Sequence, residues 1–135
     1  MKIFLDASFL IYLNASVDNN TRLAINELFK DTIKNELYTD ILVIDEVLYV
    51  SMRKYKVPYG LTFRFLDSVI MPLIEVIPLS HEDYERIKDV IKQYNIMPSD
   101  AIHISAMKKM GIKKIVSEDE DFDIIPGIER IWLKT

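Results

Sequence analysis

The sequence predicts an α/β fold with a mostly parallel central β-sheet. Short apolar segments rich in β-branched residues alternate with longer segments whose apolar residues recur at helical spacing. Strands that alternate with helices usually pair in parallel, because each helix carries the chain back to the same end of the sheet. At 135 residues, with no internal repeat or linker, the chain is expected to form a single domain over 1–135.

The first quarter of the chain predicts one strand and two helices. Lys2–Leu5 is short and apolar, as expected of a buried strand. Ser8 is placed to cap a helix that begins with Phe9–Leu13, because its hydroxyl can accept a bond from a first-turn amide. Thr21 is placed to cap a second helix that continues to about Asn35. The apolar face of that second helix is expected to consist of Leu23, Leu28, Phe29 and Ile33.

The middle of the chain predicts two further strands around a pair of helices. Tyr38–Ile44 is an apolar run typical of a buried strand, and a helix then begins near Asp45. The stretch 57–60, which contains a proline and a glycine, ends that helix, and Leu61–Ile70 forms the next one. Leu73–Leu79 is expected to be the third strand.

The last third predicts two helices and two strands. Ser80 is expected to cap the first of these helices. The second helix spans 99–110 and ends at Gly111, a residue that readily adopts the left-handed conformation common at helix ends. Lys113–Val116 and Ile128–Leu133 are expected to be the last two strands.

The composition excludes several kinds of site. With no cysteine, the chain cannot form a disulfide, a thiolate nucleophile or a Cys-ligated zinc site. Its net charge of −4 is the opposite of what binding nucleic acid by bulk positive charge requires. Asp6 interrupts the apolar N-terminal run, which is unfavourable in a secretion signal, so a cytoplasmic location is expected.

Acidic residues follow the predicted strands at several points. Asp6 directly follows the first strand, Glu46 follows the second, Asp119 and Asp121 follow the fourth, and Asp100 opens a helix. Because the carboxyl ends of parallel strands meet at one edge of a sheet, these side chains are expected to converge. Clustered carboxylates repel one another unless cations offset them, and Mg²⁺ or Mn²⁺ is the ordinary partner of such oxygen ligands. The set therefore indicates metal-assisted phosphoester chemistry.

Each acid alone also fits an ordinary structural role. Asp6 could end a turn, and Glu46 or Asp100 could be a first-turn acid favoured by the helix dipole. The acidic run 118–123 could be a solvated loop. Only the joint placement of these residues favours a common site.

Four segments carry a resemblance to a known family. They are Phe4-Leu5-Asp6-Ala7-Ser8, Ile44-Asp45-Glu46-Val47-Leu48, Pro98-Ser99-Asp100-Ala101 and Ile115-Val116-Ser117-Glu118-Asp119-Glu120-Asp121-Phe122. In their order and spacing they resemble the PIN domain, and in particular the VapC-type toxin ribonucleases, over essentially the whole chain. The resemblance implies a PIN-like three-layer sandwich, with helices on both faces of a mostly parallel sheet of about five strands. It also implies a Mg²⁺- or Mn²⁺-dependent endoribonuclease that is the toxin of a type II toxin–antitoxin system, forms a homodimer and is bound by an antitoxin protein.

The resemblance further implies metal-binding and catalytic roles by position. Asp6, Glu46 and Asp100 match the family's first three acids. The fourth acid matches Asp119 best, with Asp121 as the second candidate. Under this assignment the aspartates hold one or two metal ions, and Glu46 holds the second ion or orients the attacking water.

Two serines and a histidine lie close to these acids in the sequence. Ser8 and Ser117 are expected to orient carboxylates by hydrogen bonding. His103 lies three residues after Asp100 and so shares its helix face. There it could contact the scissile phosphate, or simply pack or bond a backbone carbonyl.

An RNA substrate also needs positive charge, and one stretch supplies it. Residues 47–66 contain no acid, and tyrosines are interleaved with the basic residues there. The candidate RNA-binding residues are Arg53, Lys54, Lys56 and Arg64. The alternative interpretation of this stretch is a pair of solvated helices.

Other functions stay open on the sequence alone. A PIN-domain nuclease of RNA processing or decay, without an antitoxin, shares the same acids, and an inactive PIN-like binding module shares the fold. A phospho-receiver module needs paired acids after its first strand, where this chain has a single Asp6. A phosphatase with an aspartate nucleophile needs Asp-x-Asp, but Ser8 stands at the second acid position.

Overall fold

The computed structural model describes residues 1–134, which form five strands and six α-helices joined by short helical turns. The strands are β1 (Lys2–Leu5), β2 (Glu36–Asp40), β3 (Ile74–Ile77), β4 (Lys114–Val116) and β5 (Glu129–Ile131). The α-helices are α1 (Ala7–Asn14), α2 (Asn19–Thr32), α3 (Ile41–Tyr55), α4 (Tyr59–Phe65), α5 (Tyr84–Tyr94) and α6 (Pro98–Met110). The shorter turns are a π turn at Leu66–Ile70 and 3-10 turns at Met71–Leu73, His81–Asp83 and Glu120–Ile124.

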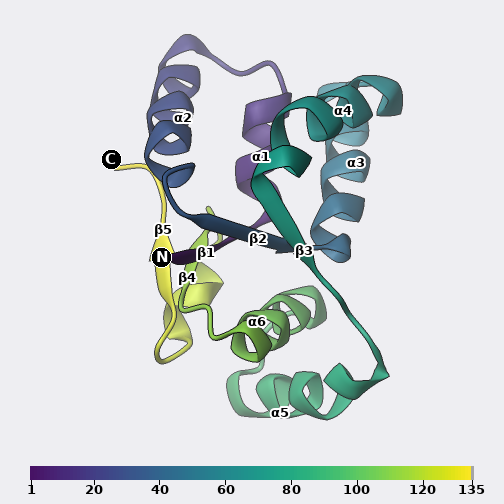
Figure 1. The fold of residues 1–135 in the computed structure, drawn as a ribbon, viewed down its shortest axis with the longest axis vertical. Coiled ribbons are helices and arrows are strands. Elements are labelled where there is room, and N and C mark those ends of the chain that lie inside the picture. The colour runs from purple at the N-terminus through teal and green to yellow at the C-terminus, as the bar shows by residue number, and fades with distance from the viewer. Residues whose placement is uncertain (135) are drawn as a thin grey trace.

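The strands form one sheet between two layers of helices (Figure 1). Their order is β3-β2-β1-β4-β5, and every neighbouring pair is parallel. In Figure 1, α1 to α4 lie on one side of the sheet, and α5 and α6 lie on the other. The predicted α/β fold, with a central parallel sheet of five strands and helices on both faces, is confirmed.

The core centres on β1, the middle strand of the sheet. Phe4 and Leu5 have no exposed surface, because helices cover both faces of the strand. Phe9 from α1 and Ile104 from α6 are equally buried and belong to the same apolar cluster. The packing leaves the carboxyl ends of β1 and its neighbours as the place where polar side chains can gather.

The prediction that the second strand covers Tyr38–Ile44 is wrong. The strand ends at Asp40, whose carboxylate accepts a bond of 3.0 Å from the Val43 amide and so caps α3. The apolar residues 41–44 form the first turn of the helix, since a short apolar run fits a buried helix as well as a strand. Glu46 therefore lies in the second turn of α3 rather than at its start.

Two predicted helix caps are also wrong. Asp6, not Ser8, is the N-cap of α1, and its carboxylate accepts a bond from the Ala7 amide. Asp18, not Thr21, is the N-cap of α2, and its carboxylate accepts bonds from the Thr21 amide and hydroxyl at 2.8 and 2.7 Å. In both cases an aspartate two or three residues earlier provides the side-chain oxygen that the helix start needs.

The buried face of α2 is rotated from the predicted one. Leu23 and Ile33 are exposed, whereas Ile25 is fully buried. The positions 25, 28, 29 and 32 are buried or partly buried, which is the i, i+3, i+4, i+7 spacing of a helix face.

The Ser80 cap and the Gly111 helix end predicted in the last third are confirmed, although α6 begins at Pro98 rather than at Ser99. The Ser80 hydroxyl accepts from the Glu82 amide, and the Asp83 carboxylate accepts from the Ser80 amide. Gly111 ends α6 in the left-handed conformation, at φ 69°. Within residues 1–134, no helix combines the length and the apolar character needed to cross a membrane.

Candidate active site

The carboxyl ends of two neighbouring central strands hold the buried part of the site. Asp6 follows β1 and is 6% exposed, and Ser117 follows β4 and is fully buried. The Ser117 hydroxyl donates to Asp6 Oδ2 at 2.6 Å and accepts from the Asp119 amide at 3.0 Å. One hydroxyl therefore orients the carboxylate after β1 and also holds the loop that carries Asp119.

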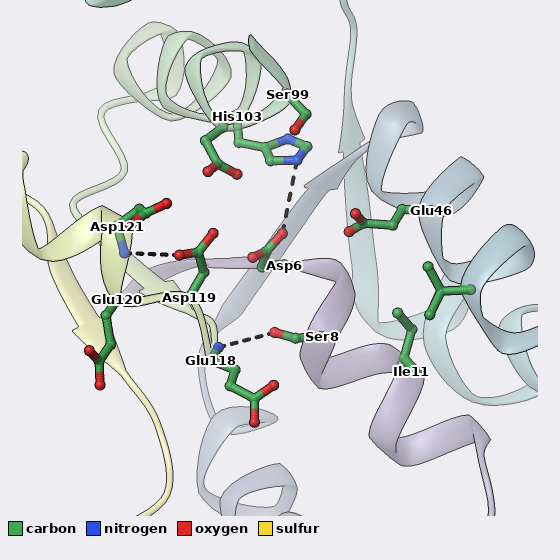
Figure 2. A pocket seen from close by; sticks show the side chains of 12 residues that line it. Asp6, Ser8, Ile11, Glu46, Ser99, His103, Glu118, Asp119, Glu120 and Asp121 are labelled. Atoms are coloured by element: carbon green, nitrogen blue, oxygen red, sulfur yellow. Dashed lines mark hydrogen bonds and ion pairs between the residues drawn. The ribbon is translucent and has the colours of Figure 1, made fainter. Parts of the chain in front are cut away.

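A cavity of about 550 Å³ opens at this edge of the sheet (Figure 2). All five acids predicted as metal ligands line it, although they come from four separate parts of the chain. They are Asp6, Glu46, Asp100, Asp119 and Asp121. Figure 2 shows Glu46 reaching from α3 toward Asp6, while Asp119 and Asp121 lie on the other side of Asp6. The convergence expected from the strand ends is thus present.

Three of these acids form a tighter group. Asp100, Asp119 and Asp121 each offer a carboxylate oxygen, and these three oxygens lie within 4.8 Å of one another. Asp100 stands in the first turn of α6, and Asp119 accepts a bond of 2.9 Å from the Asp121 amide at the start of a 3-10 turn. Because both acids of the loop join the group, the two candidates for the fourth acid lie at the same site. Closely spaced carboxylate oxygens suit a hard divalent cation.

The electrostatics of the cavity also favour a cation. Burial raises the pKa of Asp100 to about 7, and the charges of Asp119 and Asp6 contribute to this increase. Burial and the charge of Asp6 raise the pKa of Glu46 as well. A cation among these groups would favour their ionised forms. It would thereby offset the free-energy cost of ionising carboxylates that are buried and close together.

A buried histidine connects the site to the end of β2. His103 is 3% exposed, with Nδ1 2.7 Å from Asp40 Oδ2 and Nε2 3.9 Å from Asp6 Oδ1. Burial acts to lower the pKa of His103, but the hydrogen bond and charge of Asp40, followed by the charges of Asp6 and Asp100, raise it overall. His103 therefore bonds a carboxylate rather than the backbone carbonyl that was one of its expected partners.

Asp40 supports the site through His103 without lining the cavity, and the sequence interpretation missed it. It is the last residue of β2, at the same carboxyl edge of the sheet where Asp6 follows β1, and the same rule would have singled it out. The signal was hidden because the predicted strand continued through it to Ile44.

The remaining predicted residues lie at the margin of the site or outside it. The Ser8 hydroxyl accepts from the Glu118 amide at 3.1 Å, so it holds the loop after β4 rather than a predicted metal ligand. The predicted RNA-binding residues are exposed and stand outside the cavity, near the end of α3 and on α4. They are Arg53, Lys54, Lys56 and Arg64.

Comparison with known proteins gives consistent matches over nearly the whole chain. The family model for the PIN domain matches residues 3–128. Ribonuclease VapC13 of Mycobacterium tuberculosis is 27% identical over 134 residues, which cover 96% of this chain and 98% of that protein.

Two solved structures share the fold. VapC20 of Mycobacterium tuberculosis, described as a sarcin-ricin loop cleaving toxin, is 17% identical with a TM-score of 0.72, over 90% of this chain and 92% of that one. A toxin–antitoxin complex from Klebsiella pneumoniae contains a chain that is 18% identical with a TM-score of 0.69, over 94% of this chain and 95% of that one.

Proposed function

Because the chain belongs to the PIN domain family, we propose that it is a divalent-metal-dependent endoribonuclease and the toxin of a type II toxin–antitoxin system. The observation that carries the proposal is the convergence of five acids on one cavity at the carboxyl end of the sheet. A relative named as a ribonuclease, and a toxin structure and a toxin–antitoxin complex that share the fold, support it.

The residues of the cavity fit a divalent ion, and they would have separate roles in binding it and in positioning water. Asp100, Asp119 and Asp121 would hold the ion, since their oxygens already lie together, and Asp6 would complete the ligand set. When bound, Mg²⁺ or Mn²⁺ supplies an activated water and stabilises charge on the phosphoryl oxygens. Glu46, which faces Asp6 across the cavity, would orient the attacking water or hold a second ion.

The first experiment is cleavage of a mixed RNA pool by the purified chain with Mg²⁺, Mn²⁺ or EDTA. Wild type should cleave with a metal and not with EDTA, and Asp6→Asn should lose at least two orders of magnitude in rate, on the order of the loss typical when a charged active-site group is removed. Asp67→Asn is the matched control, because Asp67 is exposed and lies outside the cavity. Full metal-dependent cleavage by Asp6→Asn would contradict the assignment of Asp6 to the active site.

Toxin activity needs a separate test, since a nuclease of RNA processing would also cleave the pool. Expression of wild type should arrest growth, and co-expression of a small protein encoded by a neighbouring gene should relieve it. Growth arrest by wild type but not by Asp100→Asn would link toxicity to the acids. We also propose that the protein acts in the cytoplasm. We further propose that it forms a homodimer, which light scattering on the purified chain would test.

A further inference from the structure

A second cavity lies beside the acid site and shares one residue with it. Its volume is about 390 Å³, within the range of small-ligand pockets. Glu118 lines both cavities, and Figure 2 shows its carboxylate pointing away from Asp6 and Asp119. A chain of nucleotides bound across the acid site could therefore place a neighbouring group in the second cavity.

The walls of this cavity are aromatic. Tyr12 comes from α1, Tyr55 from the last residue of α3, and Trp132 from the segment after β5. The rings of Tyr12 and Trp132 have centroids 5.8 Å apart and are tilted by 40°. Three aromatic side chains from three parts of the chain thus line the cavity, and aromatic side chains are the groups on which nucleobases commonly stack.

The polar side-chain groups of the cavity are carboxylates, hydroxyls and the indole N–H of Trp132. The Tyr12 hydroxyl donates to the Glu118 carboxylate and lies 3.0 Å from each of its oxygens, and burial together with Glu118 raises the pKa of Tyr12 to about 12. Each Glu118 oxygen keeps a free lone pair for a ligand, because a carboxylate can accept about four bonds. Asp18 also lines the cavity, and none of its lining residues is a lysine or arginine in the part of the chain that the structure describes. This lining repels a phosphate and favours a group that donates hydrogen bonds.

The loop that borders the cavity is held in place by its own hydrogen bonds. Asp18 accepts from the amide and hydroxyl of Thr21, and the Arg22 guanidinium donates to the Leu13 and Ala15 carbonyls. A preformed pocket loses little conformational freedom when a ligand enters.

We propose that this cavity binds a nucleobase of single-stranded RNA beside the scissile phosphate, and that it selects guanine over uracil. The inference rests on the proposed nuclease function and specifies how that nuclease chooses its substrate. The aromatic walls would stack on the base, while Glu118 would accept hydrogen bonds from its Watson–Crick edge, where guanine offers two adjacent donors and uracil one. The phosphates would stay outside, where the Lys54 ammonium lies 5.4 Å from the centroid of the Tyr55 ring.

Trp132 makes the test direct, because it is the only tryptophan of the chain. Its fluorescence is followed while the trinucleotides UGU and UUU are added in EDTA, which prevents metal-dependent cleavage. UGU should quench saturably and bind about tenfold more tightly than UUU, a difference typical of one paired base edge. Tyr55→Leu, which keeps the apolar packing, should weaken UGU binding by about tenfold through lost stacking. Glu118→Gln, at an exposed position, should bring the ratio of the two affinities close to one.

Tyr84→Leu is the matched control, because Tyr84 is an exposed tyrosine on α5 with the Lys88 ammonium 5.3 Å from its ring centroid. It should leave both affinities unchanged. Equal binding of UGU and UUU by wild type would overturn the proposal. Quenching by arginine methyl ester but not by RNA would also overturn it, because that result would indicate a protein side chain as the occupant. RNA cleavage with metal but without preference for UGU would overturn the base pocket and leave the nuclease intact. Selective UGU binding without cleavage under any metal would overturn the nuclease function and leave the base pocket intact.

Discussion

At the scale of single residues, one buried carboxyl group makes the stability of the fold depend on pH. Burial raises the pKa of Asp100 from 3.8 to about 7, with the charges of Asp119 and Asp6 adding to the effect. Between these two values the folded protein holds a proton that the unfolded chain has released. The contribution of Asp100 to stability is therefore complete at low pH and is lost as the pH rises from about 4 to about 7.

Asp100→Asn should remove this dependence, because asparagine has no proton to lose. In EDTA, the stability of the variant relative to wild type should rise between about pH 4 and about pH 7, and the variant should be the more stable at pH 7.5. Saturating Mg²⁺ should stabilise wild type at pH 7.5 and not the variant, since the ion favours the ionised carboxylate. Parallel pH profiles of the two proteins in EDTA would contradict the raised pKa.

A second residue-scale prediction concerns the buried pair of His103 and Asp40. His103→Leu leaves the Asp40 carboxylate buried without its partner and should lower the free energy of unfolding by about 3 kcal/mol. The double variant with Asp40→Asn should recover part of this loss, because asparagine keeps an oxygen for the Val43 amide and carries no charge. A double-mutant cycle by urea denaturation measures the coupling, and purely additive losses would show that the two side chains act independently.

Sequence reasoning finds the acids of this site more readily than their supports. Asp6 and Asp119 stand after strands and follow one rule, so their position in the chain is enough to suggest convergence. The bond from Ser117 to Asp6 crosses between two strands that are far apart in the sequence. The contact of His103 with Asp40 likewise joins α6 to the end of β2, and no local spacing encodes either contact.

At the scale of elements, the boundary between β2 and α3 shows where local patterns become ambiguous. The residues Ile41–Ile44 are apolar and would be buried in a strand or a helix, so periodicity over four residues does not distinguish the two. The Asp40 cap decides the outcome by satisfying the Val43 amide. The helix therefore begins at Ile41, earlier than the predicted start near Asp45. Glu46 then lies in the second turn of the helix and faces the cavity.

The carboxyl ends of helices give clearer sequence signals than this boundary does, and Gly111 allows the cost of its left-handed conformation to be tested. It closes α6 at φ 69°, where a side chain is strained, so Gly111→Ala should lower the free energy of unfolding by about 1 kcal/mol. Gly60→Ala is the control, because Gly60 lies in α4 at an ordinary φ with open space around its Cα. That variant should be neutral or slightly stabilising by helix propensity. Urea denaturation compares the two, and equal effects would show that the left-handed conformation carries no cost.

At the scale of the whole molecule, the proposed function requires an acidic protein to bind a polyanion. The net charge of −4 and the acids of the cavity both oppose RNA binding, so attraction has to come from bound metal and from local positive charge. The stretch 47–66 contains no acid and continues from the cavity along α3. Lys54 and Lys56 stand near its middle, one with its ammonium beside the Tyr55 ring and the other just past the helix end.

If these lysines contact phosphates, neutralising them should flatten the salt dependence of RNA binding. Lys54→Gln combined with Lys56→Gln should reduce the slope of log affinity against log salt by roughly 1.4, since each contact with a single strand contributes about 0.7. Lys88→Gln combined with Lys92→Gln is the matched control, because both lysines lie on α5, across the sheet from α3 in Figure 1. Binding of the inactive Asp6→Asn background to a labelled single-stranded RNA, measured at several salt concentrations, gives the slopes. If both lysine pairs change the slope equally, only the overall charge attracts RNA, and the stretch 47–66 is then no binding face.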